Sequence, residues 1–160
     1  MIVNISAGKK RELVFTDASE FAGSGKITGN APRVIKINLD GRGATANITF
    51  AFVAKSDTFI NCIICHNAPQ TKSHLTVKAV LMEKTHAEIH ACVIISPKAK
   101  GSEAFQQLDA LLVGNKATVN PVPELKIKNN DVKCGHSSSV GRVNKDALFY
   151  YMSRGITKQK

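Results

Sequence analysis

The sequence has no tryptophan, only 6% aromatic residues and only 4 cysteines among its 160 residues. So few aromatic rings argue against a stacking surface for single-stranded nucleic acid. A disulfide-stabilised secreted domain would carry far more cysteine, so we expect reduced thiols, as in the cytosol. The N-terminus also lacks a charged segment followed by a long apolar run, which argues against a secretory signal.

Long uncharged runs and acidic residues are scarce as well. The uncharged run Gly43–Ala54 is too short for a membrane-spanning helix, which needs about 20 apolar residues. The chain has 12 Asp and Glu against 22 Lys and Arg, for a net charge of +10. Because most basic residues are scattered singly, we interpret them as a solvated surface and not as a nucleic-acid site. The sequence therefore predicts a cytoplasmic protein with neither a membrane nor a nucleic acid as partner.

The length predicts a single domain over residues 1–160. Short apolar runs alternate with turn residues along most of the chain, a pattern typical of a β-sandwich, β-barrel or solenoid. No helical crossovers intervene, which disfavours an α/β fold, and no repeat of constant length selects among the three β architectures. The predicted strands are Ile2–Ile5, Glu12–Phe15, Arg33–Leu39, Thr45–Ala54, Thr58–Ile64, His74–Met82, Ala87–Ile95, Asp109–Val113 and Glu124–Lys128.

One helix is predicted near the C-terminus. Asn144 is a suitable N-cap, Leu148 and Tyr151 have helical spacing, and Gly155 follows as a stop. Residues 103–108 fit helix or strand equally well by propensity.

The string Cys62-Ile63-Ile64-Cys65-His66 has the spacing of c-type haem attachment. It could also contribute to a zinc or iron site, since thiolate and imidazole are preferred ligands of both metals. On a strand, however, Cys62 and Cys65 point to different faces, and buried cysteines usually pack as small apolar residues. A zinc or haem site at Cys62, Cys65 and His66 is therefore the alternative hypothesis. Three further candidate ligands lie later in the chain, on one face of another strand: His86, His90 and Cys92.

Cys134 and His136 form a third group, in a glycine-containing stretch. A thiol and an imidazole two residues apart lie on the same face of an extended segment, where they could share an iron ion. Nucleophilic catalysis by such a pair would need an orienting third group, and none is evident. The chain also has no nucleophile elbow, phosphate-binding loop or paired-carboxylate motif, so we do not predict an enzyme.

This third group belongs to a longer pattern. Its most specific block runs from Phe149-Tyr150 to Arg154-Gly155-Ile156. Over about residues 33–156 the chain resembles the core domain shared by SufB and SufD, the scaffold proteins of the SUF iron-sulfur cluster assembly system. Further matching blocks are Leu39–Ala44, His66–Pro69, Val93–Ala99, Leu111–Val113, Pro123–Ile127 and Asp131–His136.

The resemblance implies an all-β fold, a right-handed parallel β-helix with a short C-terminal helix. It also implies pairing with a SufB-like chain or a second copy, with a transient iron-sulfur cluster built at the interface. His136 occupies the place of a cluster-assembly histidine of SufD-like members, and Cys134 matches the cysteine of the same motif. We expect the helix to cover one open end of the β-helix and self-association to protect another edge.

Departures from the family pattern indicate a SufD-like member. Where SufB-like members carry an essential cysteine the chain has Ala117, and where they carry a glutamate after the motif histidine it has Ser137. The family's N-terminal helices and its C-terminal helices that dock the SufC ATPase have no counterpart in this sequence, which argues against SufC binding. The expected function is that of a cluster assembly scaffold; a β-helix interaction module without cluster chemistry is a second alternative.

Overall fold

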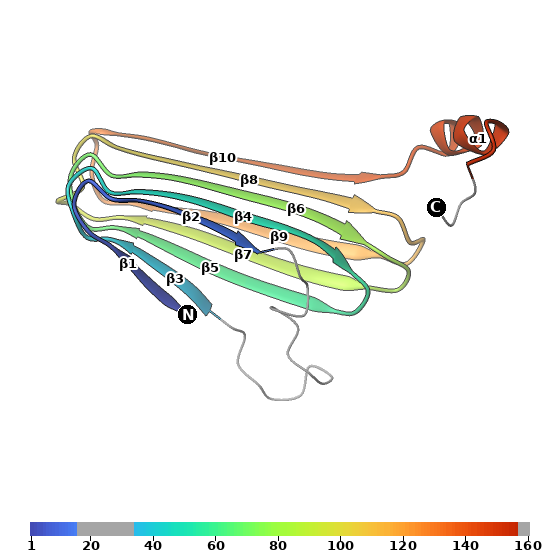
Figure 1. Cartoon of the computed structure of the whole chain (residues 1–160), viewed down its shortest axis with the longest axis horizontal. Helices are drawn as coiled ribbons and strands as arrows, with labels where there is room; N and C mark the ends of the chain where they lie inside the picture. The colour runs from blue at the N-terminus through green and yellow to red at the C-terminus, as the bar shows by residue number, and fades with distance from the viewer. Residues whose placement is uncertain (16–33, 157–160) are drawn as a thin grey trace.

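The computed structural model describes residues 1–15 and 34–156, which form a parallel β-solenoid with two sheets and a helix beyond the last strand (Figure 1). The all-β fold and the C-terminal helix are thus confirmed. One sheet has the order β1 (Ile2–Ile5), β3 (Val34–Leu39), β5 (Thr58–His66), β7 (His86–Ile95) and β9 (Thr118–Ile127). The other has the order β10 (Val132–Arg142), β8 (Ser102–Leu112), β6 (Lys72–Leu81), β4 (Thr45–Ala54) and β2 (Lys10–Phe15). Helix α1 spans Lys145–Ser153.

Alternation of apolar residues positions the core between the two sheets. In β7 every second residue, from Ala87 to Ile95, is buried, and in β4 the same holds from Ala46 to Ala54. These inward side chains meet across the solenoid, while their neighbours face solvent on the outside. The largest fully buried side chains include Ile37, Leu39, Ile48, Phe50, Ile64, Leu75 and Leu81.

The register explains why no constant repeat is visible in the sequence. Val34 pairs with Asn61, 27 residues further along the chain, whereas His86 pairs with Thr118, 32 residues further. The strands nevertheless stay aligned, because the extra residues are placed in the turns. Each turn of the solenoid can therefore differ in length without shifting which side chains face inward.

One column of turns repeats the same backbone conformation. Gly8, Gly43 and Gly101 have φ angles of 65°, 70° and 69°, and Gln70, in the intervening turn, has 59°. Glycine adopts this left-handed conformation without strain. The turns are joined by backbone hydrogen bonds, such as Gly43 N to Pro69 O (3.1 Å) and Gln70 N to Lys100 O (2.8 Å).

The last three strands differ most from the sequence prediction. Strand β8 includes residues 103–108, and β9 begins at Thr118 despite Pro121 and Pro123. Proline is tolerated there because β9 is an edge strand of its sheet, where one row of amides has no partner strand in the described structure. Strand β10 was not predicted as a strand, because Gly135 and its serines interrupt the apolar alternation; its pairing with β8 nevertheless makes it a strand.

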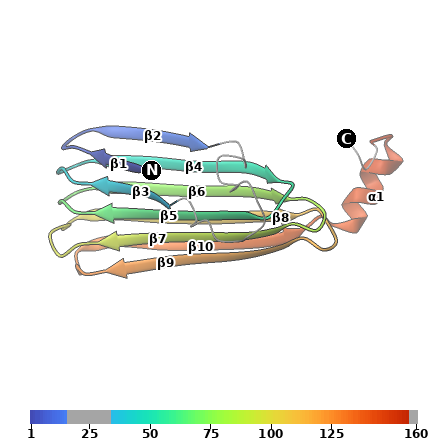
Figure 2. The ribbon, with the colours of Figure 1, turned by 90° about the horizontal axis from the view of Figure 1, so that it is seen from below.

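Helix α1 begins and ends as predicted, but it does not cover the core. The Asn144 side chain accepts a hydrogen bond from Asp146 N (2.8 Å), and Gly155 has a φ of 83°. Phe149 is 75% exposed and Tyr151 is also exposed, and Figure 2 shows the helix beyond the ends of the strands. The expectation that it caps the solenoid is therefore wrong. Within residues 1–15 and 34–156, no helix is long and apolar enough to span a membrane.

Arg142, the last residue of β10, ties this strand to the preceding turn. Its guanidinium donates to Gly114 O (2.9 Å), Asn115 O (3.4 Å) and Ala117 O (3.2 Å). The carbonyls belong to the turn between β8 and β9, so one side chain connects the ends of both sheets. Only the planar guanidinium presents several donors at once in a fixed geometry.

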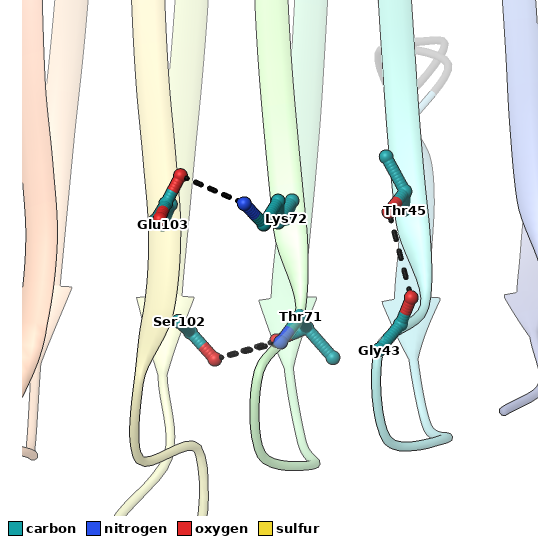
Figure 3. A network of polar contacts seen from close by, with 6 residues as sticks. All are labelled: Gly43, Thr45, Thr71, Lys72, Ser102 and Glu103. Atoms are coloured by element: carbon teal, nitrogen blue, oxygen red, sulfur yellow. Dashed lines mark hydrogen bonds and ion pairs between the residues drawn. The ribbon is translucent and has the colours of Figure 1, made fainter. Parts of the chain in front are cut away.

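A buried polar network occupies one corner of the solenoid. His66 Nδ1 contacts Thr71 Oγ1 and His66 Nε2 contacts Ser73 Oγ, both at 2.8 Å. Thr71 N donates to Ser102 Oγ (3.1 Å), as Figure 3 shows beside the surface ion pair of Lys72 and Glu103. Burial lowers the pKa of His66 from 6.5 to about 4, because the charged imidazolium would lose its hydration.

We predict that Arg142→Lys lowers the free energy of unfolding by about 1–2 kcal/mol, because a single ammonium cannot bond all three carbonyls. Urea denaturation followed by circular dichroism measures this loss. Lys133→Arg, a substitution on the outer face of the same strand, is the control and should leave stability unchanged. Equal stability of Arg142→Lys and wild type would contradict the proposed tie.

We also predict that His66 makes stability depend on pH. The unfolded chain takes up a proton as the pH falls through 6.5, whereas native His66 does so only near pH 4. The folded state therefore loses up to about 3 kcal/mol between these values. Denaturation of wild type and His66→Gln across this range should show the stability difference shrinking as pH falls. His74→Gln, which removes an exposed histidine on the outer face of β6, is the control.

Candidate functional site

Strand β10 places Cys134 and His136 on the inward face of the solenoid. In the register with β8, Cys134 pairs with Ala104 and His136 pairs with Gln106. Ala104 and Gln106 are buried, so their partners on β10 point to the same side. The prediction that the thiol and the imidazole share one face is confirmed.

These two residues lie where the solenoid ends. Strands β9 and β10 are the outermost strands of their sheets, so in the described part of the chain no further turn stacks on them, and their inward side chains are covered from one side only. We call this end of the solenoid, formed by β9 and β10, the open end. His136 is exposed there, whereas Cys134 is half-buried and packs against the core. The open end also includes Val119, Pro121, Pro123, Leu125 and Val132, all only partly buried.

The surroundings of Cys134 favour the neutral form of its thiol. Burial raises its pKa, and a hydrogen bond with the Ala104 backbone offsets part of that effect. Binding of iron would displace the thiol proton, since the thiolate is the metal ligand. Together Cys134 and His136 would supply two soft ligands, fewer than the four that protein-bound clusters usually take. Among the described residues no three His, Cys, Asp or Glu side chains are close enough together to hold a metal ion.

The structure does not bring Cys62, Cys65 and His66 together. Cys62 points into the core, where burial and the nearby Cys92 raise its pKa to about 12. Cys65, three residues later, faces the opposite side of β5. His66 is buried with both ring nitrogens hydrogen-bonded to hydroxyl groups. Metal binding at any two of them would require breaking the packing of β5.

The row His86, His90 and Cys92 shares one face of β7, as predicted, and the structure shows that this is the outer face. Glu88 stands between the histidines, 3.8 Å from His86 Nε2 and 3.6 Å from His90 Nε2. Burial and a hydrogen bond with Glu124 raise the pKa of Cys92 to about 11, so this thiol is a poor nucleophile at neutral pH. The row faces away from Cys62, which points inward.

Sequence reasoning missed Gln106 beside His136. The side chain is only 2% exposed, although glutamine is seldom fully buried. The alternation of Ala104, Gln106 and Leu108 within β8 was the available signal, and it could not be used while residues 103–108 had no assigned structure.

Comparison with known proteins shows which family the chain belongs to. The model of the SufBD core domain of SUF system FeS cluster assembly matches residues 16–160, which include β10. Relatives named iron-sulfur cluster assembly SufBD family protein occur in Staphylococcus saprophyticus, Staphylococcus epidermidis and Staphylococcus aureus. Each is 27% identical over 135 residues, which cover 84% of this chain and 29% of the relative. The chain thus spans less than a third of the length of these relatives, and it belongs to the SufBD core domain family of the SUF iron-sulfur cluster assembly system.

Proposed function

We propose that the chain is a SufD-like component that supports assembly of an iron-sulfur cluster, with His136 and Cys134 contacting iron or the nascent cluster as substrate. The observation that carries this proposal is their shared inward face at the open end of the solenoid. A neutral imidazole offers a lone pair to iron, and a cysteine offers a thiolate once its proton has left. Both are ligand types found in protein-bound clusters.

The open end also supports association with another chain. Strands β9 and β10 each leave one row of backbone groups without a partner strand in the described structure, and the apolar residues between them are partly exposed. Such edges readily pair with other strands. A SufB-like chain or a second copy seated here would cover the apolar residues and supply the remaining cluster ligands.

Ala117 supports a SufD-like role. The residue lies in the turn before β9, is fully buried and has no thiol to receive sulfur. By the family resemblance, a SufB-like partner would carry the sulfur-accepting cysteine at this place. Our proposal therefore assigns iron contact to this chain and sulfur delivery to the partner.

We expect anaerobic reconstitution with iron and sulfide, in the presence of a SufB-like chain, to give a charge-transfer absorption that weakens clearly in His136→Ala. His136 is exposed, so the variant should fold normally. His74→Ala is the matched control, an exposed histidine on the outer face of β6. Equal absorption in wild type and His136→Ala would remove His136 from the site.

We further expect the open end to mediate association. Ser138→Lys places a charge on its inward face, whereas Ser139→Lys, one residue along, places the same charge on the outer face. Size-exclusion chromatography with light scattering, alone and with a SufB-like chain and the SufC ATPase, should show that only Ser138→Lys weakens association. A complex without iron or sulfide would instead favour the interaction-module alternative, and a monomer at high concentration would contradict the interface.

A further inference from the structure

Only one of the two polar atoms of the Gln106 side-chain amide forms a hydrogen bond in the described structure. Its Nε2 donates to Ala91 O (3.1 Å) across the inside of the solenoid, from β8 to β7. Because a carbonyl can only accept, this contact fixes which end of the amide is the nitrogen. Oε1 therefore points elsewhere, and it is buried with no hydrogen-bond partner among residues 1–15 and 34–156. A buried acceptor of this kind is costly unless a donor reaches it.

The neighbours of Gln106 leave few candidate donors. On one side it pairs with Leu75 of β6, which has no polar side-chain atom. Along β8 the next inward residues are Ala104 and Leu108, which have none either. On the other side it pairs with His136 of β10, at the usual strand spacing of about 4.8 Å. His136 is thus the adjacent inward side chain that carries an N–H donor.

We propose that Gln106 is the positioning residue of His136. Oε1 has no partner in the described structure, and a rotation of the exposed His136 side chain brings one imidazole N–H to it, which selects the tautomer and turns the lone pair of the other nitrogen toward the open end. The bond from Nε2 to Ala91 O holds the amide in place, so the orientation of His136 is transmitted from the opposite sheet. Histidine ligands of metals are commonly held in this way, by a carbonyl that accepts their second N–H.

The cluster part of this inference rests on the proposed function, whereas the tautomer part does not. Nitrogen-15 labelling of the histidines reports the tautomer directly in long-range proton–nitrogen spectra of the metal-free protein. At a pH of about 8, where an ordinary imidazole is neutral, we expect one tautomer of His136 to dominate. The His136→Ala spectrum assigns the signal.

Variants at Gln106 test the cause. Gln106→Met fills the same volume without an acceptor, so His136 should revert to a mixture of tautomers. Gln106→Glu keeps an acceptor oxygen but loses the Nε2 donor to Ala91 O, so it should restore the single tautomer only in part. Gln107→Met is the matched control on the same strand, since Gln107 faces outward and donates to Asp109 Oδ2 (2.8 Å). Cys134→Ala tests whether the neighbouring thiol is the donor instead, and it should leave the tautomer of His136 unchanged.

Binding of ferrous iron alone, followed anaerobically, then gives the functional readout. Loss of the positioning bond should weaken the affinity by about 10–100-fold in Gln106→Met, with partial recovery in Gln106→Glu. A mixed tautomer in wild type, or an unchanged one in Gln106→Met, would overturn the inference even if iron binds. Conversely, a tautomer that responds as expected in a protein that binds no iron would uphold the positioning role and contradict the proposed function. If Gln106→Met fails to fold, the wild-type tautomer still decides.

Discussion

The parallel backbone ladder is the constraint on which the rest of this structure depends. A strand inside the solenoid forms hydrogen bonds with a neighbour on each side, so its inward residues are covered by the turns above and below. Among the described residues, the outermost strands lack one of these neighbours. At the open end of the described structure, the inward residues of β9 and β10 combine partial burial with access from outside. Cys134 and His136 have both properties because of their position in the ladder.

The alternation of apolar and polar residues predicted strands correctly where the two faces of a strand differ in polarity. In β7 the inward alanine, isoleucine and valine residues alternate with polar ones, and the strand was placed within one residue. Strand β10 has serine on both faces and glycine on the outer one, so its pattern carries no such signal. It is a strand because β8 offers a backbone ladder, which is a property of the neighbour. Helix α1 shows the converse, since its apolar residues suggested burial that no packing partner in the described structure supplies.

The same distinction applies to the candidate site. The spacing of Cys134 and His136 predicted a shared face, because two residues on an extended segment are sufficient to define it. Gln106 could not be predicted as their companion, because its relation to His136 depends on a register between strands 30 residues apart. The separation of Cys62 from Cys65 was predictable, since it follows from the parity of positions within one strand. The hydrogen bonds that occupy His66 were not, because they depend on the corner between β5 and β6.

The one-sided pairing of β10 has a further consequence for dynamics. In a solenoid each turn is stabilised mainly by the adjacent turns, and unfolding starts most easily where one neighbour is missing. The backbone that carries Cys134 and His136 thus opens at a lower free-energy cost than the strands paired on both sides, apart from the tie of Arg142 to the preceding turn. A ligand or partner that binds only the closed form of β10 stabilises it by mass action. Occupancy of the site and order of the last turn are then thermodynamically linked, so that binding of a ligand makes β10 more rigid.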